Sequence, residues 1–333
     1  MQVRSLDTDT VTSLVADATT APSMHNAQPW LFRYARGTGV LRMRMDPARA
    51  MPHADPDHRA LHVGCGAALF NLRVAAARAG WEPGITLLPD PADPEVLADV
   101  VFGKPVAADD RLADLYPALA RRRTNRFPFT EEAVPQAVRD ELSGAALAEG
   151  ARLVFLDAWQ TEAVLELVRD AEAEEASDAG KRAEVARWTW RAESADDPGR
   201  AEGIPSYALG PRRHGGRAPV RDFAASERPA GRGTAVFEQM PCLAVLGTRQ
   251  DRPVDWLHAG QAVERVLLQA TLDGLATSLN SHALEWPELR WAVRDPRSAM
   301  GHAQMLIRFG YGPEVPATPR RPVEEVLRVD EAG

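Results

Sequence analysis

The chain has very few cysteines and no excess of positive charge. The two cysteines, Cys65 and Cys242, are far apart and outside any Cys-x-x-Cys spacing, which argues against a disulfide framework or a structural zinc site. The 39 basic and 47 acidic residues give a formal net charge of -8, which is unfavourable for general binding to nucleic acid or membrane surfaces. We therefore expect a protein of the reducing cytoplasm without nucleic-acid or membrane partners.

Long apolar runs are also missing from the sequence. No segment approaches the roughly eighteen apolar residues that a membrane span needs, and the N-terminal stretch carries Asp7 and Asp9 in place of a signal peptide's apolar core. The 45% of hydrophobic and 26% of charged residues are ordinary for a soluble globular protein. A length of 333 residues predicts two domains, or one core built from two similar halves.

The first third of the chain mixes helix and strand signals. Thr8 or Asp9 can cap a helix whose apolar side chains recur at helical spacing between positions 11 and 18. Alternating apolar residues at 30–34 and 41–45 flank a glycine-rich turn, which predicts a β-hairpin with one buried face.

A polar cluster at positions 53–62 invites a metal assignment. It lacks the helical spacing of a histidine pair and any cysteine partner, so we favour a solvated polar loop and predict no metal site. The cluster consists of His53, Asp55, Asp57, His58 and His62.

Two apolar helices form the centre of the predicted fold. One covers 64–79 and the other about 255–272, and each leads through a glycine toward a strand. Setting Gly66 on Gly260 predicts a strand-helix-strand unit used twice about a pseudo-twofold axis, although helical periodicity alone also aligns apolar positions. The matched pairs are Ala68 with Ala262, Leu69 with Val263, Leu72 with Val266, Val74 with Leu268, Ala76 with Ala270 and Gly80 with Gly274.

The remaining elements follow from periodicity and from proline positions. We predict a helix over 109–123 kinked or shortened by Pro117, a helix with Pro135 in its first turn, a strand at 153–156, a long helix over about 159–190, strands at 85–88, 243–246 and 305–309, and a short amphipathic segment over 323–329.

Arginines gather at two separate turns of this acidic protein. The first turn holds Arg121 to Arg123, Thr124 and Arg126, and the second lies in the tail Thr318 to Pro322. A solvated basic face would explain each turn. Because the planar guanidinium fork suits phosphate oxygens, we favour an anion site that both turns face.

Two loops complete the pattern. The run Ala21 to Trp30 is dense in turn-formers and amides, and it is either a simple connector or the wall of a site. Residues 196–233 are rich in glycine, proline and arginine, and they form either a disordered stretch or a lid.

Taken in order, these motifs resemble the FMN-dependent nitroreductase superfamily, and within it the internally duplicated, single-chain Acg-like branch. The resemblance implies an α+β nitroreductase-like fold in which two similar halves form a pseudo-dimer in one chain, with a long lid loop at about 196–233. Residues 1–105 would form the first half and 106–333 the second. The matching motifs are APSMHNAQPW at 21–30, RRTNR at 122–126, Gly203 to Pro211 and TPRRP at 318–322.

The resemblance also implies a binding site for FMN, built from both halves. Arg122 and Thr124 would hold the phosphate, with Arg320 and Arg321 closing on it from the tail. Arg126 would lie near the pyrimidine side of the flavin. The ring or ribityl chain would be lined by Pro22, Ser23, Met24 and Asn26, and the region of flavin N5 would be approached by Ser281 and His282.

The function implied is an oxidoreductase in which NAD(P)H reduces FMN and the reduced flavin reduces a small organic acceptor. The flavin carries the chemistry, so no side-chain acid or base is required, and His25 and His282 are candidates by position only. A flavin-sequestering protein, whose lid blocks turnover, is the alternative. A purely structural role without flavin would leave the arginine turns without a purpose. Since the halves already meet within one chain, a monomer is expected.

Overall fold

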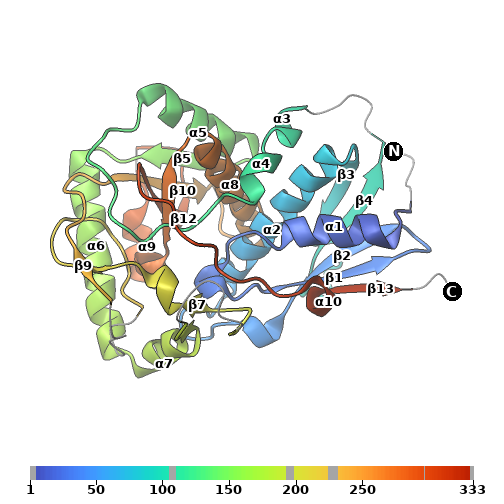
Figure 1. Ribbon diagram of the computed structural model, residues 1–333, viewed down its shortest axis with the longest axis horizontal. Helices are drawn as coiled ribbons and strands as arrows, with labels where there is room; N and C mark the ends of the chain where they lie inside the picture. The colour runs from blue at the N-terminus through green and yellow to red at the C-terminus, as the bar shows by residue number, and fades with distance from the viewer. Residues whose placement is uncertain (1–4, 105–109, 193–198, 224–231, 296, 331–333) are drawn as a thin grey trace.

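The computed structural model describes residues 5–104, 110–192, 199–223, 232–295 and 297–330. Two sheets of mostly antiparallel strands lie at opposite ends of the molecule, and two long helices, α2 (Arg59–Arg78) and α8 (Pro253–Leu272), pack together between them (Figure 1). Separate helices and mostly antiparallel strands confirm the predicted α+β class.

The first sheet has the strand order β13-β1-β2-β4-β3. Its neighbours are antiparallel except for β13, which is parallel to β1. The helices α1 and α2 pack on it through an apolar core that includes Trp30 and Tyr34. The elements are α1 (Thr8–Ala18), β1 (Trp30–Ala35), β2 (Val40–Met45), the 3-10 turn η2 (Pro47–Arg49), β3 (Glu82–Leu87), β4 (Val96–Gly103) and β13 (Leu327–Asp330).

The second sheet has the strand order β11-β12-β10-β5 and is antiparallel throughout. Helices α5 and α8 cover one face, and α6 with α9 covers the other, so its strands contribute apolar side chains in both directions. The elements are α5 (Gln136–Ala148), β5 (Arg152–Phe155), α6 (Ala158–Ser177), β10 (Cys242–Thr248), β11 (Ala276–Asn280), η4 (His282–Glu285), α9 (Pro287–Val293) and β12 (His302–Gly310).

The two halves share one topology. The order β1, β2, α2, β3, β4 in the first half is repeated as β5, β10, α8, β11, β12 in the second, with matching neighbours in each sheet. The register that sets Gly66 on Gly260 also sets the first and last residues of α2 on those of α8. Gly80 and Gly274, matched in the same way, both adopt positive φ (77° and 76°) just beyond the helix ends. Two similar halves are therefore present, while their origin by duplication remains a prediction.

Helices α2 and α8 cross at two glycines. A Cβ at Gly66 would overlap the carbonyl oxygen of Leu257, and a Cβ at Gly260 would overlap the carbonyl oxygen of Val63. The same alignment pairs Val63 with Leu257, so the contact is reciprocal, as in an interface with twofold symmetry. Only glycine allows the backbones to approach this closely.

The long connection between β5 and β10 carries α6, α7 and the predicted lid. We call its described residues 199–223 and 232–233 the lid segment, and the predicted lid positions 196–198 and 224–231 lie outside the described residues. Besides α6, the elements of the whole connection between β5 and β10 are α7 (Ala179–Arg187), β6 (Thr189–Trp190), β7 (Ile204–Pro205), the 3-10 turn η3 (Ser206–Leu209), β8 (Arg212–Arg213) and β9 (Thr234–Ala235).

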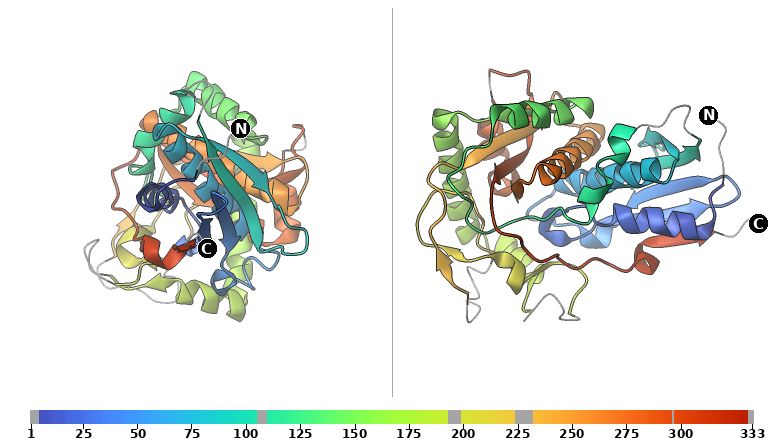
Figure 2. Two further views of the ribbon diagram at one scale, coloured as in Figure 1. Left: turned by 90° about the vertical axis from the view of Figure 1, so that its right-hand side faces the viewer. Right: turned by 45° about the horizontal axis from the view of Figure 1, so that its top comes forward.

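The C-terminal tail crosses back from the second sheet to the first. After β12 it runs as an extended segment to α10 (Val323–Val326) and β13, as the red trace in Figures 1 and 2 shows. The predicted second half, 106–333, is therefore not confined to the second sheet. The boundary predicted after residue 105 falls within residues 105–109, which lie outside the described residues, and it stays a prediction.

Two local predictions were wrong in detail, while the predicted interruption of a helix by Pro117 is confirmed. The cap of α1 is Asp7, whose Oδ1 accepts from the backbone N of Thr10 at 2.7 Å, in place of Thr8 or Asp9. The helix predicted over 159–190 breaks at Asp178, which adopts an extended conformation and caps α7. The helix predicted over 109–123 is two short helices, α3 (Asp110–Ala113) and α4 (Tyr116–Leu119), because Pro117 cannot continue α3.

The prediction that no segment is apolar enough to span a membrane also needs correction. Among the described helices, α2 passes that test by length and composition, with a mean hydropathy of 1.3. However, 89% of this apolar window is buried inside the molecule, between the first sheet, α1 and α8. The apolar character of α2 thus serves protein packing.

The glycine crossing makes a testable prediction for stability. Gly66→Ala should destabilise the protein by about 1–3 kcal/mol or more, because the added methyl group meets rigid backbone of α8. Gly144→Ala, within α5 and facing open space, is the matched control and should stabilise by up to about 1 kcal/mol. Urea unfolding measures both changes, and equal effects would contradict the close approach.

Candidate functional site

The loop that links α1 to β1 has an unusual backbone. Within its 3-10 turn η1 (Met24–Asn26) and just after it, three non-glycine residues have positive φ: His25 (49°), Asn26 (56°) and Gln28 (54°). Each such residue costs on the order of 1 kcal/mol or more and persists only where the surroundings enforce it. Ser23 helps, because its Oγ accepts from the backbone N of Gln28 at 2.9 Å.

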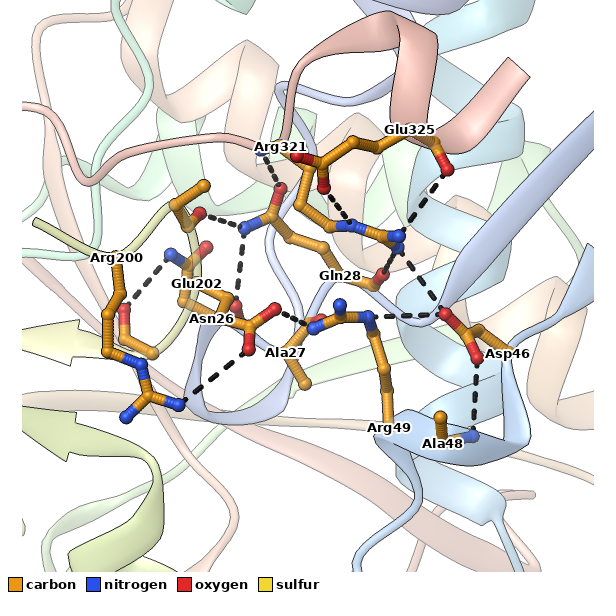
Figure 3. Close-up of polar contacts among 12 residues, drawn as sticks. Asn26, Ala27, Gln28, Asp46, Ala48, Arg49, Arg200, Glu202, Arg321 and Glu325 are labelled. Atoms are coloured by element: carbon orange, nitrogen blue, oxygen red, sulfur yellow. Dashed lines mark hydrogen bonds and ion pairs between the residues drawn. The ribbon is translucent and has the colours of Figure 1, made fainter. Parts of the chain in front are cut away.

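Side-chain amides tie this loop to two distant segments. Asn26 donates from Nδ2 to the carbonyl oxygens of Gly203 and Pro319, both at 3.1 Å, and its Oδ1 accepts from Arg320 at 3.0 Å. Gln28 donates to the carbonyl of Ala201 at 2.7 Å (Figure 3). The loop is therefore held by the lid segment and by the tail, so it is more than a connector.

Figure 3 shows that Arg321 belongs to this supporting network. Its backbone N donates to Gln28 Oε1 at 2.8 Å, and its guanidinium pairs with Asp46 at 3.5 Å and Glu325 at 3.4 Å. Arg49 joins Asp46 to Glu202 of the lid segment. The structure does not place Arg321 beside the other predicted phosphate ligands.

The first arginine turn follows α4 and is fixed by backbone bonds. Arg122 N donates to the carbonyl of Ala118 at 2.8 Å, and Asn125 N donates to the carbonyl of Thr277 in β11 at 2.8 Å. Thr124 forms an isolated parallel bridge with Thr277. These bonds attach the turn to β11, the edge strand of the second sheet. The side chain of Arg122 extends from the turn toward Thr20 of the first half.

Both arginine turns and the Ala21 to Trp30 loop meet at one cavity of about 190 Å³, which we call the anion cavity. The predicted ligands on its wall are Pro22, Ser23, Asn26, Arg122, Thr124, Arg126 and Arg320. Thr20, Tyr207 and Thr318 add polar groups to the same wall. Residues from both halves, the lid segment and the tail therefore line a single space.

Arg122 and Arg320 both line this cavity, and their like charges repel one another. Arg122 is 4% exposed and donates from Nη2 to the carbonyl of Thr20 at 3.2 Å, while its Nε and Nη1 have no hydrogen-bond partner among the described residues. Arg320 donates to the carbonyls of Thr19 and Thr20. Burial, and then the charge of Arg122, lower the pKa of Arg320 to about 9. A bound anion would give the unpaired donor of Arg122 a partner and would offset the repulsion between the two guanidinium groups.

Behind Arg122 lies a buried carboxylate, Glu264 of α8. It is 0% exposed, and its Oε1 lies 3.4 Å from Arg122 Nε. Burial raises the pKa of Glu264 to about 7, although Arg122 and Asn71 act in the opposite direction. This residue was not predicted as part of the site.

A smaller cavity of about 80 Å³ adjoins the anion cavity, and we call it the ring cavity. Pro22, Ser23, Thr124 and Arg126 line both, so the two spaces share one wall. The other residues on its wall include Met24, His25, Arg59, Gly64, Val263, Phe223 and Ser281. Gly64 allows Ser23 to lie against α2, because a Cβ there would come within 3.2 Å of Ser23 Cβ.

Phe223 of the lid segment lines the ring cavity and lies close to three polar side chains. Its ring is edge-on to His25 with centroids 5.3 Å apart, and the guanidinium carbons of Arg126 and Arg221 each lie 5.2 Å from its centroid. Burial lowers the pKa of Arg126 to about 10, and that of His25 falls well below its usual value because of burial and Arg221. His25 is therefore neutral at neutral pH.

His282 lies outside both of these cavities. It pairs with Glu175 of α6, and Arg221 of the lid segment bridges Glu175 (3.0 Å) and Glu285 (2.7 Å). Burial opposes ionisation, but the hydrogen bond with His282 and the charge of Arg221 lower the pKa of Glu175 to about 2. Ser281, by contrast, lines the ring cavity and donates to Glu285 at 2.9 Å.

Sequence reasoning missed Arg59, Phe223 and Glu264. Arg59 opens α2 and lines the ring cavity, but nothing in its local pattern separates it from a surface arginine. Phe223 lies in a loop without periodicity. Glu264 did carry a signal, because a carboxylate inside a helix that is otherwise apolar on most sides must have a buried partner.

The chain is similar over nearly its whole length to proteins of Mycobacterium tuberculosis (strain ATCC 25618 / H37Rv). It is 33% identical over 331 residues to "Putative NAD(P)H nitroreductase acg", covering 97% of this chain and 96% of that protein. It is 32% identical over 332 residues to "Putative NAD(P)H nitroreductase Rv3131", covering 96% of this chain and 92% of that protein. The chain therefore belongs to the Acg-like family of nitroreductases, which confirms the predicted family.

Solved structures are more distant. A nitroreductase in complex with FMN from Desulfovibrio desulfuricans is 16% identical and has a TM-score of 0.37, covering 66% of this chain and 98% of that one. The FMN and NADPH-dependent nitroreductase NfnB from Sphigopyxis is 17% identical with a TM-score of 0.38, covering 66% and 99%. No family model matches the chain.

The role of Asn26 can be tested by limited proteolysis. Asn26→Ala removes the bonds to Gly203, Pro319 and Arg320, so we expect a loss of about 1–3 kcal/mol and faster cleavage within the lid segment. Asn125→Ala is the matched control, because Asn125 is also buried and bonds Pro313 and Phe127 but not the lid segment. Equal cleavage rates in the two variants would show that Asn26 does not hold the lid segment.

Proposed function

We propose that the protein is an FMN-dependent oxidoreductase of nitroreductase type, with NAD(P)H as electron donor and a small organic molecule as acceptor. The single observation that carries the proposal is the anion cavity, where Arg122 Nη1 is buried without a partner among the described residues, next to a ring cavity that shares part of its wall. Family membership supports the same reaction class. We further propose that it acts in the cytoplasm as a monomer.

The donor set fits a phosphate group. Arg122 offers a buried Nη1 without a partner among the described residues, while its Nε lies 3.4 Å from Glu264 Oε1, and Thr124 and Thr318 offer hydroxyls on the same wall. The N–H groups of Arg320 already donate to backbone carbonyls and to Asn26, so Arg320 would contribute to phosphate binding mainly through its charge. Charge-assisted bonds from guanidinium to phosphate are among the stronger polar contacts in proteins.

The ring cavity is the proposed place of the flavin ring, because it adjoins the anion cavity. FMN, when bound, supplies a ring that accepts hydride from NAD(P)H and passes reducing equivalents to the acceptor. Arg126 places a buried positive charge beside this cavity and donates only to the carbonyl of Ala208, at 3.1 Å, among the contacts the structure describes. That charge would favour electron uptake by the ring.

His25 would act as a hydrogen-bond donor in this site. Its Nε2 lies 3.4 Å from Arg221 Nη1 and, being neutral, accepts there, which leaves the proton on Nδ1. That Nδ1 is buried and has no partner within the described chain. The strained conformation of His25 holds this donor at the ring cavity, so its role is to orient a ligand and not to exchange protons.

A second candidate function is flavin sequestration, and Phe223 favours it. Its ring occupies the space between Arg126 and His25, and Arg221 anchors the lid segment beside it through Glu175 and Glu285. A side chain that covers the ring cavity would exclude the donor and acceptor as effectively as it excludes water. The oxidoreductase and the sequestering protein therefore differ in whether Phe223 moves out of the ring cavity when a substrate approaches.

The cofactor assignment predicts a specific loss of affinity. Arg122→Ala should weaken FMN binding about 10- to 100-fold, and Arg122→Ala with Arg320→Ala should weaken it further, because charge-assisted phosphate contacts are lost. Riboflavin, which lacks the phosphate, should bind all forms with similar affinity. Arg121→Ala is the matched control, since Arg121 is exposed on the same turn but outside the anion cavity. Unchanged FMN affinity in the double variant would refute the assignment.

The choice between enzyme and sequestering protein is decided by anaerobic reduction. With FMN bound, addition of NADPH or NADH should bleach the flavin absorbance if the protein is an oxidoreductase. Phe223→Ala should accelerate bleaching severalfold by opening the ring cavity, while Phe155→Ala, in the core of the second half, is the control. Flavin that stays yellow in the wild type but bleaches in Phe223→Ala would support sequestration.

A further inference from the structure

Glu264 is a buried acid that the proposed reaction does not use. It lies in α8 with 0% exposure, and neither carboxylate oxygen has a hydrogen-bond partner within the described residues. An ionised carboxylate in such a place is costly unless it is paired and hydrogen-bonded. Its one close cation is Arg122, at 3.4 Å, which is also the central residue of the anion cavity.

Few charged or polar groups act on Glu264 from the elements packed around it. Asn71 faces it from α2, Arg122 from the turn after α4, and Arg320 from the tail. Two other arginines of these helices, Arg73 of α2 and Arg265 of α8, are engaged elsewhere, since both pair with Glu149 at the end of α5. Arg122 therefore provides the compensating positive charge both for Glu264 and for any anion bound in the anion cavity.

We propose that Glu264 takes up a proton when a phosphate group binds at Arg122, so that this carboxyl is a proton-linked counter-ion for the FMN phosphate. The inference rests on the proposed function, because it takes the anion cavity as the phosphate site. Without the phosphate, the carboxylate compensates Arg122. With the phosphate bound, a charged Glu264 would place a third negative charge beside one guanidinium, and protonation removes it.

The sign of the effect follows from linkage. Burial already raises the pKa of Glu264 to about 7, and a nearby phosphate raises it further. Proton uptake on binding then means that FMN affinity falls as the pH rises above about 7. The phosphate itself has a second pKa of about 6, so above pH 7 its own ionisation changes little and does not mask the trend.

Titration calorimetry of the full chain with FMN tests the proposal. At pH 8, measurements in two buffers of different ionisation enthalpy count the protons taken up, and we expect close to one per FMN for the wild type. Riboflavin, without the phosphate, should take up none. Wild-type affinity for FMN should fall about tenfold between pH 6.5 and 8, which is the shift that a carboxyl titrating near 7 imposes.

Two variants assign the proton to its residue. Glu264→Gln should abolish proton uptake and, at pH 8, bind FMN about tenfold more tightly than the wild type, because the glutamine is neutral at every pH. Glu149→Gln is the matched control, as Glu149 is also buried but pairs with Arg73 and Arg265, and it should keep the wild-type proton count.

The outcomes are separable. FMN binding without proton uptake by the wild type would overturn the role of Glu264 while leaving the proposed function intact. Failure of the wild type to bind FMN at all would overturn the proposed function as well. If Glu264→Gln does not fold, the infrared band of a protonated carboxyl, appearing on FMN binding to the wild type and absent with riboflavin, decides the question in its place.

Discussion

The close crossing of α2 and α8 is the contact on which the rest of the molecule depends. Gly66 and Gly260 let two backbones meet without intervening side chains, and this brings the two sheets to a fixed distance on either side. The ring cavity lies along the same helix pair, with Gly64 and Val263 on its wall, and Glu264 of α8 lies behind Arg122 of the anion cavity. A larger residue at either crossing glycine would therefore widen the site as well as the core.

The central helices could be predicted from the sequence because local and global requirements agree there. An apolar pattern that ends in glycine predicts a buried helix, and matching Gly66 with Gly260 placed both ends of α2 on those of α8. The helix breaks at Pro117 and Asp178 show how far helix ends can be predicted from the sequence. A proline interrupts one pattern visibly, whereas Asp178 ends α6 by offering a cap to α7, a choice that periodicity does not reveal.

The candidate site was predictable only where a motif carries its own chemistry. The arginine turn and the Ala21 to Trp30 loop were identified because guanidinium groups and turn-forming amides have few ordinary uses in such clusters. Neighbouring residues then separated in space, with Arg320 at the anion cavity and Arg321 in the supporting network of Figure 3. Adjacent side chains on extended backbone point to opposite sides, so sequence proximity could not distinguish their roles.

The crossing of the tail from the second sheet to the first has a consequence for biosynthesis. A ribosome delivers Arg320 and β13 long after Thr20, Pro22 and Ser23, yet all four residues line the same cavity or lead to it. A nascent or truncated chain can form α2 and α8 but lacks the residue that completes the anion cavity. A chain terminated before Arg320 would thus leave the anion cavity open on the side of the tail, even if its two central helices had formed.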